Sequence, residues 1–151
     1  TEGEALRFTG IPSFAPELLQ VARAGDPMKA KHLEKALMQF AEEGAAKIFK
    51  PQLGSGFIVG VVGALQFEVL ASRIELEYGL PVRFEASQFT SARWVHGARD
   101  KVDAFATANK QHMAVDNDDD PVYLTRLQWD IDRVERDYPD VRLSATKELM
   151  V

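Results

Sequence analysis

The sequence predicts an α+β fold built from two successive units with the same order of strands and helices. Apolar residues spaced three and four positions apart, as in helices, alternate along the chain with short apolar or β-branched runs typical of strands. The order of these segments in the first half recurs in the second. No stretch rich in glycine, serine or proline separates the halves, so we expect them to move as one body.

The first unit begins with a predicted strand at 6–9 and a short predicted helix at 16–24 that ends before Gly25. A longer helix follows, with Asp26 as its cap, a proline at the first helical position and Gly44 at its end. Its apolar residues recur at helical spacing and predict one buried stripe. That stripe consists of Leu33, Ala36, Leu37, Phe40 and Ala41.

Two strands are predicted at 46–49 and 57–62, joined by a loop that contains glycines. The second of them is apolar throughout, which is typical of a central strand. A second helix closed by Gly79 and an alternating strand at 82–86 complete the unit. The buried stripe predicted for this helix is Phe67, Leu70, Ala71, Ile74 and Tyr78.

The second unit is predicted from the same signals in the same order. Its strand at 92–95 is followed by a helix around 102–106, strands at 113–115 and 122–125, a helix over 127–138 and a strand at 141–145. Strand–helix–strand–strand–helix–strand is the ferredoxin-like order, which gives an antiparallel sheet with two helices on one face. We therefore predict tandem ferredoxin-like units at 1–88 and 89–151, packed on each other.

The composition excludes several classes of site. Without cysteine the chain has no disulfide, thiolate metal site or cysteine nucleophile, which suits the cytoplasm. Its net charge of −5 argues against nucleic acid as the sole partner, and we expect no DNA binding. The longest apolar stretch, 57–65, is too short to cross a membrane, and no secretion signal opens the chain. Because residue 1 is threonine, we expect a segment of a longer protein.

No segment carries a nucleotide-binding motif. Gly54, Gly56 and Gly60 precede and enter a strand, whereas a phosphate-binding loop opens into a helix. The pattern Gly-x-x-x-x-Gly-Lys-Ser/Thr is absent from the sequence, so this chain is not expected to bind GTP by itself. We assign the three glycines to turn formation and close packing.

The acidic run at 116–120 and the histidines do not form a metal-binding motif. An EF-hand needs glycine at its sixth position and glutamate at its twelfth, where this chain has Pro121 and Leu127. A solvated, charge-rich hairpin is therefore the interpretation of the run. The three histidines lie far apart and lack metal-ligand spacing. We predict no catalytic residue, no cofactor-binding residue and no metal ligand.

Several basic residues are candidates for contact with an RNA backbone. Two of them lie on or beside the predicted strand at 46–49, one flanks an aromatic residue on the predicted strand at 92–95, and two open the helix that follows. If the sheet brings them together, they form a positive patch suited to phosphate contact. Scattered lysines and arginines that maintain solubility are the alternative interpretation. The candidates are Lys47, Lys50, Arg93, Trp94, Arg99 and Lys101.

Two long segments resemble a known family. The segment 8–44 opens with Phe-Thr-Gly-Ile-Pro and ends with Phe-Ala-Glu-Glu-Gly, and the segment 59–82 runs from Val-Gly-Val-Val-Gly to Gly-Leu-Pro-Val. Shorter markers are Ala-Arg-Trp-Val at 92–95 and Tyr-Pro-Asp-Val at 138–141. This pattern is similar to domain III of elongation factor G-like GTPases, and it most closely resembles the same region of the peptide chain release factor three family. The resemblance covers nearly the whole chain.

The resemblance implies that the parent is a cytoplasmic GTPase of translation termination, with its GTP and Mg²⁺ site in an upstream domain absent from this sequence. That parent would bind the ribosome and promote departure of the class I release factor, which reads the stop codon. The resemblance also implies that this segment contacts rRNA and protein of the small subunit and its own GTPase domain. Translocation activity is not expected to transfer, because nothing here resembles the long fourth domain of elongation factor G. The segment itself is not expected to be an enzyme.

Two other functions are compatible with paired units of this kind. A regulatory domain would sense a small molecule at the interface of the units, and it would need convergent polar groups. Arg126 and Gln128, beside the last predicted helix, are the candidates for that role. An enzyme would need an anion-holding loop, for which the Gly-Ser-Gly sequence at 54–56 is the candidate.

Overall fold

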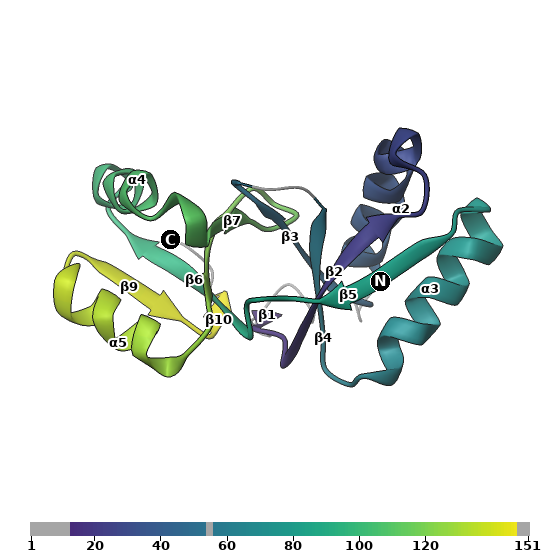
Figure 1. Cartoon of the computed structure of the whole chain (residues 1–151). Helices are drawn as coiled ribbons and strands as arrows, with labels where there is room; N and C mark the ends of the chain where they lie inside the picture. The colour runs from purple at the N-terminus through teal and green to yellow at the C-terminus, as the bar shows by residue number, and fades with distance from the viewer. Residues whose placement is uncertain (1–12, 54–55, 148–151) are drawn as a thin grey trace, which may run out of the picture.

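The computed structural model describes residues 13–53 and 56–147, which form two α+β units (Figure 1). The first group of elements is β1 Ser13–Phe14, β2 Leu18–Ala24, the 3₁₀ turn η1 Pro27–Lys29, α2 Ala30–Glu43, β3 Lys47–Pro51, β4 Phe57–Val61, α3 Leu65–Tyr78 and β5 Val82–Ala86. The second is β6 Ser91–Gly97, α4 Arg99–Ala108, the 3₁₀ turn η2 Lys110–His112, β7 Met113–Val115, β8 Pro121–Thr125, α5 Gln128–Asp137, β9 Val141–Ser144 and β10 Thr146–Lys147.

Within the described residues, eight strands form one antiparallel sheet in the order β5-β2-β4-β3-β7-β8-β6-β9. In the first unit β2 lies between β4 and β5, and in the second β6 lies between β8 and β9. Each unit therefore inserts its first strand between its third and fourth, with a helix in each crossover. The predicted fold class, tandem ferredoxin-like βαββαβ units, is confirmed.

The two units share main-chain hydrogen bonding through β3 and β7. Lys50 pairs with Val115 and Pro51 with Ala114, and Gln52 N donates to Met113 O at 2.9 Å just beyond the last pair. A two-stranded ribbon of β1 and β10 adds a second link between distant parts of the chain. The sheet thus runs without interruption from one unit into the other.

The helices lie on the two flanks of the molecule, with α2 and α3 on one side, α4 and α5 on the other, and the strands between them (Figure 1). Each helix pair packs on its own half of the sheet and buries a separate apolar core. A third core forms between the halves, where side chains from β2, β3 and β4 meet side chains from β6, β7 and β8. We call this third core the central core. It consists of Leu19, Phe49, Ile58, Phe89, Ala92, Trp94, Ala114, Val122 and Leu124.

Strand β8 shows how one sequence serves two cores. Val122 and Leu124 belong to the central core, whereas Tyr123 between them packs under the helices of the second unit. Successive side chains of a strand point to opposite faces, so a strand covered on both faces is apolar at every position. All three of these residues are fully buried.

The prediction of a short helix over 16–24 is wrong, because most of this segment is a strand. Residues Leu18–Ala24 form β2, which pairs with β4 on one side and β5 on the other. Its residues are compatible with a helix by local propensity, but pairing on both edges satisfies its backbone and overrides that preference. Strand β2 thus takes the place in the sheet that was assigned to the strand at 6–9, which lies outside the described residues.

The predicted ends of the first two long helices are confirmed. Gly44 after α2 and Gly79 after α3 adopt φ angles of 80° and 62°, in the left-handed region where a side chain is disfavoured. The predicted start of the first of these helices is wrong: Asp26 Oδ1 accepts the amide of Met28 at 3.0 Å and caps the 3₁₀ turn Pro27–Lys29, whereas α2 begins at Ala30 without a side-chain cap. The remaining predicted strands and helices of both units also agree with the structure to within a few residues.

We predict that Gly60→Ala destabilises the protein. A Cβ at position 60 would lie 2.7 Å from Pro16 Cβ and 3.0 Å from Leu19 Cδ2, so the neighbours must move. Overpacking of this kind costs about 1–3 kcal/mol. Urea denaturation should show the loss, and Gly63→Ala is the matched control because nothing lies within 4 Å of its added Cβ. Equal stability of the two variants would contradict this account of Gly60.

Candidate functional site

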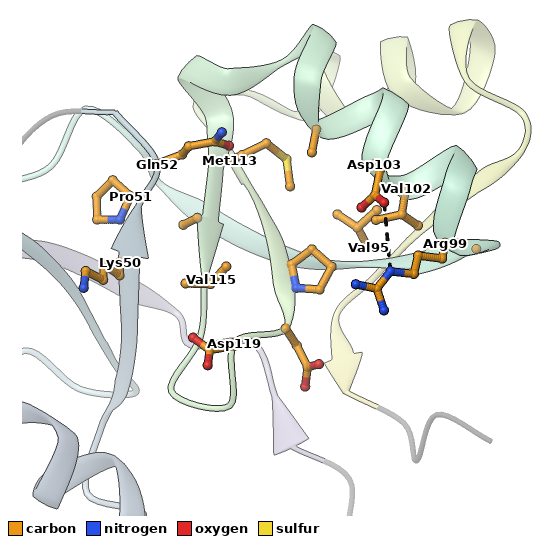
Figure 2. Close-up of a pocket in the computed structure, with 15 residues that line it drawn as sticks. Lys50, Pro51, Gln52, Val95, Arg99, Val102, Asp103, Met113, Val115 and Asp119 are labelled. Carbon is orange, nitrogen blue, oxygen red and sulfur yellow. Dashed lines mark ion pairs between the residues drawn. The ribbon is translucent and has the colours of Figure 1, made fainter.

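A cleft of about 710 Å³ lies beside the β3–β7 junction (Figure 2). One wall of the cleft is formed by the paired strands β3 and β7, one from each unit. The opposite wall is formed by α4 and the end of β6. Its apolar surface comes from Val95, Val102, Ala106, Met113 and Val115 together with prolines 51 and 121. The cleft therefore depends on the joining of the two units.

The rim of the cleft carries both signs of charge. Lys50 and Arg99 line it, and so do Asp103, Asp119 and Asp120. Arg99 Nε lies 4.0 Å from Asp103 Oδ2, and Lys50 Nζ lies 3.5 Å from Glu34 Oε2. These pairs are exposed and contribute little stability, so their side chains can exchange partners at small cost. The arrangement suits a ligand that presents both donors and acceptors.

The predicted contact residues do not converge on one surface. Lys50 and Arg99 line opposite sides of the cleft (Figure 2), whereas Lys101 is not among the lining residues and pairs with Asp140 at 3.8 Å. Arg93 lies half-buried on β6 and donates to the carbonyl of Ala92 at 2.8 Å. Lys47 is half-buried on β3, opposite Gly60.

Trp94 is not exposed for stacking. Its side chain belongs to the central core with 3% of its surface accessible, and its indole Nε1 donates to Asp116 Oδ2 at 3.0 Å. A buried indole N–H normally finds such an acceptor, because leaving it unpaired is costly. Arg93 and Trp94 are neighbours on β6, and neighbouring residues of a strand point to opposite faces. They therefore do not share one surface patch.

The acidic turn between β7 and β8 is organised by Asp116. Its Oδ1 accepts the amides of Asp118 and Asp120 at 2.9 and 3.0 Å, and its Oδ2 accepts the indole of Trp94. Carboxylate oxygens of Asp116, Asp118 and Asp120 lie within 4.8 Å of one another. Asp119, at φ 64°, makes the left-handed step of the turn. The buried carboxylate thus links the turn to the central core.

A buried polar cluster under α5 was not predicted. Arg133 Nη2 donates to Tyr123 Oη and to Asn109 Oδ1, both at 3.2 Å, and His112 stacks on the Tyr123 ring at 5.0 Å between centroids. Burial raises the pKa of Tyr123, although Arg133 opposes that shift. The cluster connects α5 to the end of α4, and no spacing in the sequence identifies such a contact between side chains far apart in the chain. Of the other histidines, His96 is buried and His32 is exposed.

The glycine-containing loop does not open into a helix. Gly56 has a φ of 87° and is followed directly by β4, while Gly54 lies outside the described residues. The N-terminus of a helix, which supplies the amides of a phosphate loop, is therefore not at this position. Among residues 13–53 and 56–147, no helix is long and apolar enough to cross a membrane.

We predict that Asp116→Asn destabilises the fold. The side-chain oxygen of the new asparagine can still accept the backbone N–H groups of the turn. Its side-chain nitrogen then faces the indole N–H of Trp94, and this buried donor loses its acceptor. Such a loss costs about 1–3 kcal/mol. Thermal and urea denaturation should detect it, with Asp119→Asn as a control that removes the same charge from the same turn. If both variants lose the same stability, charge and not the Trp94 contact is responsible.

Comparison with protein families identifies the chain. Residues 8–135 match the family model described as class II release factor RF3, C-terminal domain. The matched segment covers the described part of the first ferredoxin-like unit and the second unit as far as α5. It agrees with the resemblance found in the segments 8–44 and 59–82. The chain therefore belongs to the family of class II release factor RF3 C-terminal domains, a non-catalytic domain of translational GTPases that act in protein biosynthesis.

Proposed function

We propose that this chain is the ribosome-docking domain of a cytoplasmic translational GTPase that promotes recycling of stop-codon-reading release factors in translation termination. The observation that carries the proposal is the family match over residues 8–135. In this proposal GTP and Mg²⁺ are bound by another domain of the parent, since the sequence has no P-loop motif. The partners are rRNA and protein of the small subunit, the GTPase domain of the same polypeptide and, indirectly, the class I release factor.

The joined sheet supports a mechanical role. A domain that reports the nucleotide state of another domain must fit its partner better in one state than in the other, because only differential contact shifts an equilibrium. A body with one continuous sheet and a central core between its units transmits such a difference without bending at a linker. The pairing of Lys50 with Val115 and Pro51 with Ala114 is the main-chain part of that rigidity.

The proposed RNA-contacting residues are basic side chains at and near the cleft. Lys50 and Arg99 line it from opposite sides (Figure 2), and Lys47, Arg93 and Lys101 lie on β3, β6 and α4 outside its lining. Lysine and arginine contacts to phosphate displace counterions, so the affinity they supply falls with salt.

We predict that Lys50→Glu combined with Arg99→Glu weakens ribosome association of the full-length factor. If each side chain meets a phosphate, the slope of log affinity against log salt should become shallower by about one for each contact. Co-sedimentation with purified ribosomes across a salt series measures this slope. The control is Lys110→Glu combined with Arg136→Glu, which makes the same charge change at two exposed positions outside the cleft. An unchanged slope in the double variant would exclude these two residues from RNA contact.

The second candidate function is a small-molecule sensor, and the cleft itself favours it. Ligand pockets in proteins have volumes of about 300–1,000 Å³ and a mostly apolar lining with a few polar groups, as this cleft does. The polar candidates Arg126 and Gln128 are not among its lining residues: Arg126 bonds Gln88 at 2.7 Å, and Gln128 bonds Asp132 at 3.3 Å. A sensor would therefore use the charged rim of the cleft instead.

Thermal-shift measurements on the full-length factor with a metabolite collection separate the two functions. For a docking domain we expect no change in melting temperature that depends on the cleft. The test variant is Ala106→Phe, which places a ring in the cleft without changing charge. A stabilising metabolite whose effect disappears in Ala106→Phe would favour the sensor over the docking domain.

A further inference from the structure

Helix α3 carries an apolar stripe on the face that points away from the core. Leu65, Val69 and Leu76 are 74, 56 and 83% exposed, and Val62 in the preceding turn is 67% exposed. At 100° per residue the three helical positions fall within a narrow arc on one side of α3. The opposite side of the same helix is buried, so α3 is apolar on two faces. Its buried residues are Phe67, Leu70 and Ile74. We call Val62, Leu65, Val69 and Leu76 the α3 stripe.

The neighbouring helix α2 shows that this exposure is not required by the fold. Helices α2 and α3 cover the same half of the sheet and contact each other. After Ala30 at its first position, the exposed residues of α2 are all polar: Lys31, His32, Lys35, Gln39, Glu42 and Glu43. Single exposed apolar residues are common, but a row of them on one helix face marks an interaction surface.

The border of the α3 stripe is acidic. Glu68 and Glu75 are exposed along one side. On the other side Arg73 Nη1 lies 3.0 Å from Glu43 Oε1, and Arg73 Nε lies 2.8 Å from Glu77 Oε2. The hydrogen bond from Arg73 lowers the pKa of Glu43, so the carboxylate of Glu43 remains ionised. Of the charged residues named here, Arg73 is thus outnumbered by Glu43, Glu68, Glu75 and Glu77.

We infer that the α3 stripe binds a ribosomal protein through an apolar patch ringed by lysine and arginine. Proteins that hold ribosomal RNA carry such cations to balance phosphates, and a basic ring would complement the acidic border. RNA is disfavoured because Glu68 and Glu75 repel phosphate. A second copy of the chain is disfavoured because its own acidic border would face this one. This inference rests on the proposed ribosome docking and names its protein partner.

Site-specific photo-crosslinking tests the identity of the partner. A photoreactive amino acid replaces Leu76 in the full-length factor, which is then irradiated on purified ribosomes. Position 135 on α5, an exposed site in the other unit, is the control. We expect position 76, and not position 135, to crosslink to a basic ribosomal protein that mass spectrometry identifies. Crosslinks from position 76 to rRNA, to a second copy or to another part of the factor would overturn the inference.

Substitution provides an independent measurement. We expect the triple variant Leu65→Ser, Val69→Ser, Leu76→Ser to bind ribosomes about tenfold more weakly, since a few central apolar contacts dominate most interfaces. Its salt slope should stay unchanged, because no phosphate contact is removed. Leu127→Ser, which changes an equally exposed apolar residue outside α3, is the control. The melting temperature should not fall, because all three side chains are exposed.

The two proposals fail in different ways. If the triple variant binds ribosomes normally while the Lys50→Glu, Arg99→Glu variant has a shallower salt slope, the role of the α3 stripe is overturned. Ribosome docking itself then stays in place. No association of the unaltered factor with ribosomes in any nucleotide state overturns both.

Discussion

The pairing of β3 with β7 is the contact on which the rest of the architecture depends. Two ferredoxin-like units each have a sheet edge at their second strand, and an unpaired edge exposes a row of backbone donors and acceptors. Joining these edges satisfies both and makes one sheet of the two. The faces left without helices then meet and bury the central core. Rigidity, the central core and the cleft all follow from this one join.

The central core determines which polar groups must be paired inside the molecule. Trp94 enters that core from β6, and its indole N–H meets the carboxylate of Asp116 at the end of β7. The same carboxylate orders the turn that follows by accepting two backbone amides. Trp94 was predicted to lie in a surface patch, and the acidic run at 116–120 was predicted to be a solvated turn. Both are parts of one internal contact.

The exposed surface divides into regions of different chemistry. The cleft at the junction mixes cations with carboxylates, whereas the outer face of α3 is apolar with an acidic border. Rigid attachment of both regions to one sheet means that a partner held at one of them also fixes the orientation of the other. This is the property that the proposed ribosome docking requires.

The sequence by itself determined the fold class and most element positions, because these depend on local periodicity and on glycines such as Gly44 and Gly79. It also determined the family, through the resemblance of the segments 8–44 and 59–82. The strand identity of Leu18–Ala24 was decided only by the tertiary structure. Its hydrogen-bonding partners β4 and β5 lie far along the chain, and local propensity does not contain them. The tertiary structure also decided three features of the side chains, because strand alternation and the joining of the sheet determine which side chains meet. These features are the burial of Trp94, the polar cluster around Arg133 and the separation of Lys101 from Lys50.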